Sequence, residues 1–300
     1  MSLNTKKVIF IIGPTAIGKT ALSIKLAKTF NTDIISCDSR QFYKELKIGT
    51  SPPSIEELSE IKHHFIHNIS IKKNYNAGKF EIDAINQIQK LHKTKDIVIV
   101  VGGSGLYVNA ICNGFDKMPE ISEKIRNQIN IEYQNKGLTW LQEKVKNIDP
   151  SYTDYEIKNP QRLLRALEVF QETGRSLSSF KSNKIKKRSF ETLKIGLYMD
   201  REILYERINN RVDTMIKEGL IEEVKSLTND KYKNALQTVG YKEIFAFLNN
   251  ECTLRQAIED IKRNTRRLAK RQITWFKKEK DIKWFRPDEI ADITETILKL

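Results

Sequence analysis

The sequence contains little cysteine and no long apolar run. Its three cysteines, Cys37, Cys112 and Cys252, lie far apart, and none belongs to a C-x-x-C pair. This spacing argues against a disulfide framework and against a zinc module. No apolar run approaches the roughly 18 residues of a transmembrane helix, and the first residues do not resemble a secretory signal peptide. We therefore expect a cytoplasmic protein without a membrane span.

Charged side chains are abundant, and the basic ones outnumber the acidic ones. The 300 residues include 52 Lys and Arg against 38 Asp and Glu, which gives a net charge of +14 at pH 7. This balance favours a polyanionic partner, most simply a nucleic acid. A generally lysine-rich composition would also produce it, because Lys, Ile and Asn are frequent throughout the chain. The length allows one large domain or two modest ones.

The first part of the chain alternates between strand-like and helix-like patterns. The β-branched run KKVIFIIG predicts a buried parallel strand, and KTALSIKLAKTF has helical spacing. TDIISCDSR predicts a second strand, and DIVIVVGGSGLYVNAI predicts a third strand, a glycine turn and a helix. This order indicates an α/β fold with a doubly wound parallel sheet. Ligands of such sheets bind beyond the carboxyl ends of the strands, where residues 13–20, 38–41 and 102–105 fall.

The alternation stops after Gly114, where the pattern becomes helical. NPQRLLRALEVFQETG predicts one helix that starts at Asn159 and Pro160 and stops at Gly174. LKIGLYMD then predicts another strand, and the remainder is helical. We expect an α/β core with C-terminal helices (residues 1–115 and 186–300), interrupted by an inserted helical domain (residues 116–185).

The motif G-x-x-x-x-G-K-T follows the first predicted strand and opens the first predicted helix. Its residues are Gly13, Pro14, Thr15, Ala16, Ile17, Gly18, Lys19 and Thr20. The glycines let backbone N–H groups point inward, Lys19 adds a positive charge, and Thr20 offers a hydroxyl to Mg²⁺. This motif predicts a P-loop NTPase-like fold that binds a di- or triphosphate. DIVIVVGG ends in glycine, where many P-loop ATPases place a magnesium carboxylate, so hydrolysis does not follow from the motif.

A series of ordered motifs resembles the tRNA dimethylallyltransferases, also called tRNA isopentenyltransferases. GPTAIGKT resembles the loop of that family, and CDSRQFYKELKIGTSPPS is similar to its D-S-x-Q-x-Y…I-G-T segment. The match continues in order through KHHFIHNI, YNAGKFEIDA, VVGGSGLYVNAI, NPQRLLRALEVFQETG, DREILYERINNRVDTMIKEGLIEEV, QTVGYKEI and TRRLAKRQITWF. It covers the chain from about Val8 to Phe276. Ser104 replaces a frequent Thr of the family, and His67 and Lys79 replace common acidic residues.

The resemblance implies a reaction and its partners. A dimethylallyl group would move from dimethylallyl diphosphate to N6 of the adenine 3′ to the anticodon (position 37), in tRNAs reading codons that begin with U. Pyrophosphate would leave, and Mg²⁺ would assist. The partners would be the anticodon stem-loop of tRNA and dimethylallyl diphosphate, bound by a monomer. No zinc-finger extension follows Phe276, as expected of the bacterial form.

The resemblance also implies roles for residues around the diphosphate. Thr15, Lys19 and Thr20 would contact the diphosphate or its magnesium ion. Arg207 and Arg211, four residues apart on one predicted helix, would close over the phosphates, with Arg211 as the first choice. A solvated helix face, in which these arginines pair with Glu206 or Asp213, is the structural alternative.

Asp38 ends the second predicted strand, beside the P-loop in this topology. The resemblance makes it the general base that accepts the proton of the adenine amine, a poor nucleophile. From position alone, Asp38 could equally ligate magnesium or cap a helix together with Ser39.

The resemblance assigns further residues to tRNA, whose splayed loop bases proteins read by their edges and by stacking. The implied contacts are Asp38, Ser39, Arg40, Gln41, Ser104, Gln161, Arg162, Leu163, Leu164, Arg165, Gln237, Thr238, Val239, Gly240, Tyr241 and Lys242. Purely structural roles are the alternative, because Tyr241 could pack in the core and RLLRALEV could be an ordinary amphipathic helix.

The segment from Lys262 to Arg271 is strongly basic. It holds Lys262, Arg263, Arg266, Arg267, Lys270 and Arg271 and no acidic residue. We expect this helix to contact phosphates, although a charge run can also be a solvated face. The four histidines, His63, His64, His67 and His92, have little carboxylate support nearby, so a metal site is not the favoured interpretation.

Three rival functions remain open from the sequence. A P-loop kinase for a small molecule shares the loop, but it does not explain the net charge or GGSGLY. A prenyltransferase that acts on free AMP or ADP shares most motifs, but the inserted helices and the basic helix favour a macromolecular acceptor. A non-catalytic RNA-binding protein would not need Asp38.

Overall fold

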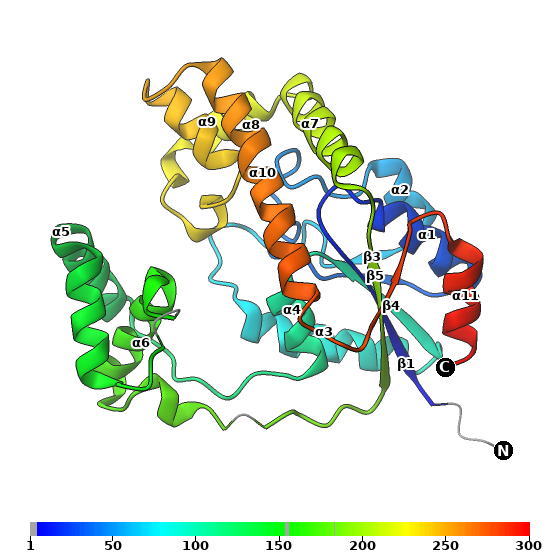
Figure 1. Cartoon of the computed structure of the whole chain (residues 1–300), viewed down its shortest axis with the longest axis horizontal. Coiled ribbons are helices and arrows are strands. Elements are labelled where there is room, and N and C mark those ends of the chain that lie inside the picture. Colours follow the sequence, from blue (N-terminus) through cyan, green and yellow to red (C-terminus); the bar gives the residue numbers. More distant parts are fainter. Residues whose placement is uncertain (1–4, 154–155, 183) are drawn as a thin grey trace. The chain divides into compact units, whose positions relative to one another are not determined.

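The computed structural model describes residues 5–153, 156–182 and 184–300 of the chain (Figure 1). The chain folds into two compact units. One comprises Met1–Asn113 together with Lys187–Leu300, and the other comprises Gly114–Lys186. In the described part of the chain, no helix is both long and apolar enough to cross a bilayer.

A six-stranded sheet forms the centre of the first unit. Its strands are all parallel and lie in the order β3-β2-β4-β1-β5-β6. They are β1 (Lys7–Ile12), β2 (Ile34–Ser36), β3 (His63–His64), β4 (Ile97–Gly102), β5 (Glu191–Leu197) and β6 (Ile282–Phe285). The inner strands β1 and β4 are continuous apolar runs, because both faces of a parallel sheet are covered.

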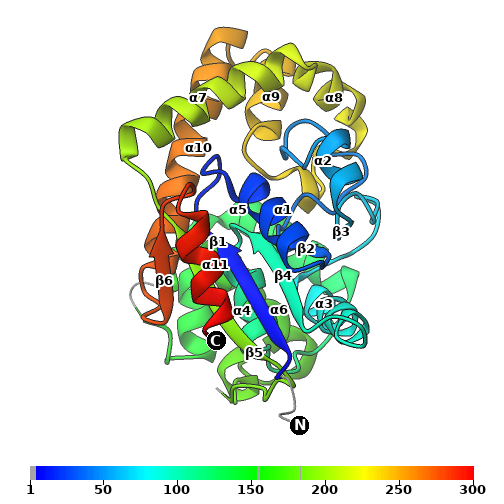
Figure 2. The ribbon, with the colours of Figure 1, turned by 90° about the vertical axis from the view of Figure 1, so that its right-hand side faces the viewer.

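Helices cover both faces of the sheet. On one face, Ile9 and Ile11 of β1 pack in a cluster with α1 (Lys19–Thr29) and α11 (Ile290–Leu298). On the other face, Val8, Phe10 and Ile12 pack in a second cluster with α3 (Ala77–Leu91) and α4 (Gly105–Cys112). The two layers of helices enclose the sheet in Figure 2. The alternation along β1 therefore fills both halves of the core.

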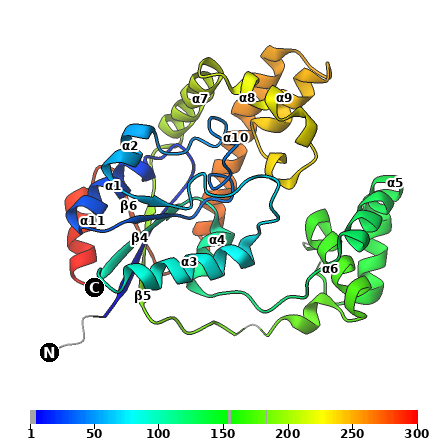
Figure 3. The ribbon, with the colours of Figure 1, turned by 180° about the vertical axis from the view of Figure 1, so that it is seen from behind.

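The remaining elements of this unit gather mainly beyond the carboxyl ends of the strands. They are α2 (Ile55–Glu60), α7 (Arg201–Lys217), α8 (Leu220–Ser226), α9 (Tyr241–Leu248), α10 (Leu254–Phe276) and the 3-10 turns Thr228–Asp230 and Asn234–Leu236. Figures 2 and 3 show α7, α8, α9 and α10 at that end of the sheet, from two sides. The sheet thus presents its carboxyl edge to these helices.

The chain leaves the neighbouring strands β1 and β4 toward opposite faces. β1 continues into α1 on one face, whereas β4 continues into α4 on the other. Such a switch point opens a crevice between the two connections, which is where ligands bind in doubly wound sheets. The predicted α/β fold with a doubly wound parallel sheet is confirmed.

The second unit is a helical pair with its own core. α5 (Glu123–Ile148) packs on α6 (Pro160–Thr173), and short 3-10 turns occupy Glu156–Lys158 and Leu177–Phe180. Gly137, with φ of 76°, interrupts α5. α6 begins and ends as predicted, because the Asn159 side chain accepts the first free N–H groups and Gly174 adopts a left-handed conformation.

A close backbone approach joins the ends of β2 and β4, and it generates a stability prediction. A Cβ atom on Gly102 would lie 2.1 Å from the carbonyl oxygen of Cys37. We expect Gly102→Ala to lower the free energy of unfolding by about 2–3 kcal/mol, since the strands must separate to admit the methyl group. Urea denaturation measures this change.

Gly78→Ala is the matched control. Gly78 lies in α3, and the nearest atom to its added Cβ is the Asn76 side-chain oxygen at 3.4 Å. Alanine is the better helix former, so this variant should be at least as stable as the wild type. Equal stability of Gly102→Ala and Gly78→Ala would contradict the close approach.

Candidate active site

The P-loop follows β1 and curls through unusual backbone conformations. Gly13 and Gly18 have φ of 148° and 104°, and Ala16 has φ of 66°. A Cβ on Gly13 would lie 3.1 Å from the carbonyl oxygen of Leu197, so this position favours glycine for space as well as for φ. A left-handed alanine is strained and persists where the surrounding structure holds it. The loop is therefore built to keep a fixed curl, with its backbone N–H groups available to an anion.

The helix α1 starts without a side-chain cap. Gly18 is its N-cap residue, the first turn holds no acidic side chain, and no side chain accepts a hydrogen bond from the first free amides. The N-terminus of a helix carries partial positive charge and N–H groups that need acceptors. The start of α1 is thus suited to phosphate oxygens.

Lys19 places its ammonium group inside the loop. Its Nζ donates a hydrogen bond to the carbonyl oxygen of Pro14 over 2.7 Å. Burial and the positive charge of Arg211 together lower the pKa of Lys19 to about 7, while the Asp38 carboxylate acts in the opposite direction. Lys19 thus lies within electrostatic reach of both an arginine and a carboxylate.

Two arginines of α7 approach the same loop. Arg211 Nη1 donates to the Thr15 hydroxyl over 3.2 Å, and Arg207 Nη2 lies 3.8 Å from the Cβ position of Gly18. Burial lowers the pKa of Arg211, and the neighbouring Arg207 lowers it further. The solvated-face alternative does not describe Arg211, and Asp213 pairs instead with Lys262 at 2.7 Å.

Lys19, Arg207 and Arg211 therefore form a cationic cluster at an uncapped helix N-terminus. Like charges at short range repel, and guanidinium groups form forked hydrogen bonds with phosphate oxygens. A ligand with several anionic oxygens would relieve the repulsion. The arrangement is chemically suited to a diphosphate or triphosphate.

Asp38 lies at the carboxyl end of β2 and shapes a turn. Its Oδ1 accepts hydrogen bonds from the backbone N–H groups of Arg40 at 2.8 Å and Gln41 at 3.3 Å. Within the described part of the chain, no hydrogen bond reaches its Oδ2. No helix begins at residues 38–41, so Asp38 stabilises a turn and the helix-capping alternative does not describe it. The turn occupies one oxygen, and the second oxygen is available for chemistry.

The turn of residues 38–41 is tied to its surroundings. The Ser39 N–H donates to the Ser104 hydroxyl over 3.2 Å, which links the turn to the loop after β4. Arg40 Nη1 donates to the Asn234 side chain over 3.2 Å. Gln41 Oε1 accepts a hydrogen bond from the Ser36 hydroxyl at 3.1 Å. The structure thus brings Asp38, Ser39, Arg40, Gln41 and Ser104 together.

The predicted tRNA segment of residues 237–242 is partly core. Gln237 and Lys242 are exposed, Thr238 and Val239 are half-buried, and Gly240 is buried. Tyr241 is fully buried, and its hydroxyl donates to Glu223 Oε1 over 2.6 Å. The packing alternative therefore describes the side chain of Tyr241.

The predicted tRNA residues of α6 lie in the helical unit and divide by exposure. Gln161 and Arg162 are exposed, whereas Leu163 and Leu164 lie in the core of that unit. Arg165 Nη2 donates to the carbonyl oxygen of Pro119 over 3.0 Å. Gln161 and Arg162 are the members of this group that solvent reaches most freely.

Gln272 of α10 is a site residue that the sequence analysis missed. Its Oε1 accepts a hydrogen bond from the Thr15 N–H, and its Nε2 donates to the carbonyl oxygen of Gly103, both at 2.9 Å. A Cβ on Gly103 would lie 2.3 Å from that Nε2. Gln272 lies in the block TRRLAKRQITWF that resembles the family, but neither that resemblance nor periodicity says which turn the helix packs against.

The basic helix α10 is more internally paired than its sequence suggests. Lys262 pairs with Asp213, Arg263 pairs with Asp260 at 2.6 Å, and Arg266 donates to Asn209 over 2.7 Å. Lys270 and Arg271 are exposed. The charge offered to a polyanion is therefore concentrated toward the end of α10 that also carries Gln272.

The histidines bind other parts of the chain. His63 Nδ1 lies 2.8 Å from the carbonyl oxygen of Ile61, and His64 Nε2 lies 2.8 Å from Asp33. His67 and His92 contact backbone carbonyl oxygens. Among the described residues, no three His, Cys, Asp or Glu side chains form a metal-binding group.

The low pKa of Lys19 generates a prediction about anion binding. Inorganic pyrophosphate should favour the protonated ammonium, so binding should raise the pKa of Lys19 above about 7 and take up a proton at mildly alkaline pH. Affinity should accordingly weaken as pH rises above 7 more steeply in the wild type than in Lys19→Met. Isothermal titration in two buffers of different ionisation enthalpy counts the protons. Identical proton counts for the two proteins would contradict the assignment.

Comparisons of the sequence with known proteins all point to one family. Residues 41–279 match the family described as IPP transferase. A tRNA dimethylallyltransferase of Flavobacterium johnsoniae is 51% identical, over 97% of this chain and 96% of the relative. A tRNA dimethylallyltransferase of Christiangramia forsetii is 52% identical, over 93% of each chain.

Solved structures give the same result. The full-length tRNA isopentenylpyrophosphate transferase of Bacillus halodurans superposes with a TM-score of 0.73 at 35% identity, covering 98% of this chain and 96% of that one. A eukaryotic dimethylallyltransferase acting on tRNA superposes with a TM-score of 0.76 at 28% identity, covering 98% of this chain and 78% of that one. With the site geometry and this full-length similarity, the chain belongs to the IPP transferase family, the tRNA dimethylallyltransferases.

Proposed function

We propose that this chain transfers a dimethylallyl group from dimethylallyl diphosphate to N6 of adenine 37 in tRNA. The acceptor adenine lies 3′ to the anticodon in tRNAs that read codons beginning with U, and pyrophosphate is released. The observation that carries the proposal is the cationic cluster of Lys19, Arg207 and Arg211 beside the free oxygen of Asp38. The cationic cluster suits a diphosphate leaving group, and the Asp38 oxygen suits an amine that must lose a proton.

The diphosphate is held by the P-loop of residues 13–20. Its oxygens replace the carbonyl oxygen of Pro14 as partners of Lys19, and they satisfy the first amides of α1. As the carbon–oxygen bond breaks, the bonding electrons pass to the diphosphate. Lys19 and Arg211 neutralise the added charge. The hydrogen bond from Arg211 to the Thr15 hydroxyl holds the guanidinium group at the loop. We call the P-loop together with Lys19, Arg207 and Arg211 the cradle. Arg207 completes it near Gly18.

Magnesium fits this site as a partner of the substrate. The described residues offer no cluster of three carboxylate, His or Cys ligands, and Mg²⁺ commonly takes only one or two protein ligands and completes its shell with phosphates and water. The Thr20 hydroxyl would hold the ion, which when bound would neutralise diphosphate oxygens.

Asp38 receives the proton of the acceptor amine. The N6 lone pair forms the new bond to the dimethylallyl carbon, and the N6 proton passes to Oδ2 of Asp38. The backbone bonds from Arg40 and Gln41 to Oδ1 keep the carboxylate fixed during this transfer. The proton of N6 therefore passes to Asp38, while the electrons of the broken carbon–oxygen bond pass to the diphosphate.

The acceptor tRNA is bound by several segments. We assign the target nucleotide to residues 38–41 and to Ser104, and flanking RNA to residues 237–242, whose exposed members are Gln237 and Lys242. Residues 116–185 are the inserted tRNA-contacting domain, in which Gln161 and Arg162 are exposed. Lys270 and Arg271 of α10 supply phosphate contacts.

The enzyme acts as a cytoplasmic monomer in this proposal. Lys19, Arg211 and Gln272 contact the P-loop within a single chain, and we propose that this chain acts alone. Its partner, the anticodon stem-loop of tRNA, is a cytoplasmic molecule.

A transfer assay with labelled dimethylallyl diphosphate and Mg²⁺ tests the proposal. The acceptors are an anticodon stem-loop with adenine 3′ to the anticodon, the same loop with guanine there, and free AMP. Label on the adenine loop alone supports the proposal. Label on AMP would favour a free-nucleotide prenyltransferase, and ATP turnover without prenyl transfer would favour a kinase.

The role of Asp38 gives a second test. Asp38→Asn should lower kcat about a hundredfold, because the amide cannot accept the proton of N6. Its affinity for pyrophosphate should stay close to that of the wild type, since the cradle is unchanged. Transfer at the wild-type rate would eliminate Asp38 as the base, and a parallel loss of pyrophosphate binding would assign it to the cradle.

A further inference from the structure

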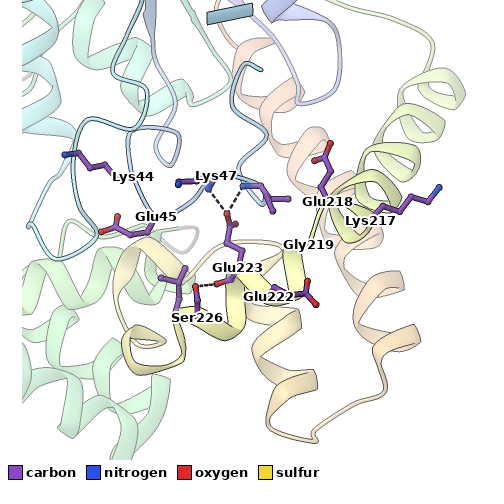
Figure 4. A pocket seen from close by; sticks show the side chains of 11 residues that line it. Lys44, Glu45, Lys47, Lys217, Glu218, Gly219, Glu222, Glu223 and Ser226 are labelled. Atoms are coloured by element: carbon purple, nitrogen blue, oxygen red, sulfur yellow. Dashed lines mark hydrogen bonds between the residues drawn. The ribbon is translucent and has the colours of Figure 1, made fainter. Parts of the chain in front are cut away.

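Glu223 of α8 stands at the centre of a hydrogen-bond group outside the site described above. Its Oε2 accepts from the backbone N–H groups of Lys47 at 2.7 Å and Ile48 at 2.8 Å. Its Oε1 accepts from the Gly49 N–H at 3.1 Å and from the Tyr241 hydroxyl at 2.6 Å. Figure 4 shows the carboxylate with its bonds to Lys47 and its neighbour. We call Glu223, Tyr241 and these three amides the clamp.

The clamp holds one loop in a fixed conformation. The added Cβ of Gly49 would lie 2.6–2.8 Å from the Tyr241 ring and hydroxyl, so the loop backbone rests directly on the tyrosine. Ser51, two residues on, has φ of 43°, which is costly for a non-glycine residue. A strained loop keeps its shape only where several contacts determine it, and the clamp supplies four.

The same loop holds the side chain of Gln41. Gln41 Nε2 donates to the carbonyl oxygens of Thr50 at 3.3 Å and Ser51 at 2.9 Å. The Gln41 N–H in turn donates to Asp38 Oδ1 over 3.3 Å. A continuous series of contacts thus leads from Glu223 through the loop to the proposed base.

We propose that Glu223 is a positioning residue for the acceptor side of the reaction. It fixes the loop of residues 47–51, which fixes Gln41 and with it the turn that presents Asp38 to the target adenine. The proposal rests on the proposed function. The clamp bonds none of the groups that hold the diphosphate, so its effect falls on the RNA acceptor and not on dimethylallyl diphosphate.

The charge of Glu223 is essential to this role. Four donors converge on the carboxylate, and a neutral amide in its place would offer one acceptor oxygen and turn an NH₂ group toward other donors. Burial and the nearby Glu223 charge raise the pKa of Tyr241, so its hydroxyl remains a donor to the carboxylate throughout the neutral range. Glutamine is therefore nearly the same shape but cannot complete the clamp.

Glu222 provides a matched control. It precedes Glu223 on the same helix, is exposed, and lines a pocket of about 770 Å³ beside the clamp together with Lys44, Lys47 and Lys217 (Figure 4). Glu222→Gln removes the same charge from the same pocket without touching the three amides. Any effect of long-range charge on RNA binding appears equally in both variants.

The test compares full-length wild type, Glu223→Gln and Glu222→Gln in the transfer assay with the adenine stem-loop. For Glu223→Gln we expect kcat/KM for the RNA to fall about tenfold. The KM for dimethylallyl diphosphate and the affinity for pyrophosphate should change less than about twofold, because the cradle is intact. Glu222→Gln should match the wild type in all of these values.

Two results would overturn the proposal. One is a kcat/KM for the RNA equal to that of Glu222→Gln. The other is a parallel loss on the donor and RNA sides, with a lower thermal midpoint, which would make Glu223 a general stability residue. If Glu223→Gln does not fold, Tyr241→Phe removes one hydroxyl and keeps the ring, and the same acceptor-side loss, smaller in size, is required. Absence of transfer by the wild type would instead reject the proposed function, and with it the positioning role that rests on that function.

Discussion

The positive charge gathered at the end of β1 is the constraint on which the rest of the site depends. Lys19, Arg207 and Arg211 come from two helices far apart in sequence and meet at a loop with little negative charge of its own. Such an arrangement persists only because the buried sheet beneath it and the packing of α7 fix the side chains from behind. Most other features of the site either orient an anion toward this charge or bring the second substrate to it.

The parallel sheet supplies that support through its topology. Adjacent strands end at one edge, so β1, β2 and β4 deliver the P-loop, the Asp38 turn and the Gly103 turn to the same place. The backbone contact between Gly102 and Cys37, and the Gln272 bridge from Thr15 to Gly103, hold these three loops at fixed spacing. The reacting groups thus depend on rigid backbone more than on side-chain packing.

Much of this arrangement could be predicted from local sequence. The P-loop, the doubly wound sheet and the limits of α6 follow from patterns of fewer than twenty residues, in which each residue constrains its neighbours directly. Gln272 and Glu223 could not be predicted in this way. Gln272 meets Thr15 and Glu223 meets Lys47 across most of the chain, and neither lies in a motif whose chemistry requires it. Tyr241 shows a different limit, since the resemblance assigns this position to tRNA but does not reveal that its side chain is buried in the core.

The depressed pKa of Lys19 also affects the stability of the folded chain. A lysine whose folded pKa is about 7, below its unfolded value of 10.5, destabilises the fold most below pH 7, and the penalty fades as pH rises toward 10.5. The empty enzyme therefore sits below the stability that its core could support at neutral pH. A polyanion that binds only the folded state restores part of that difference. Occupancy of the P-loop by a diphosphate would thus protect the folded chain against unfolding and proteolysis.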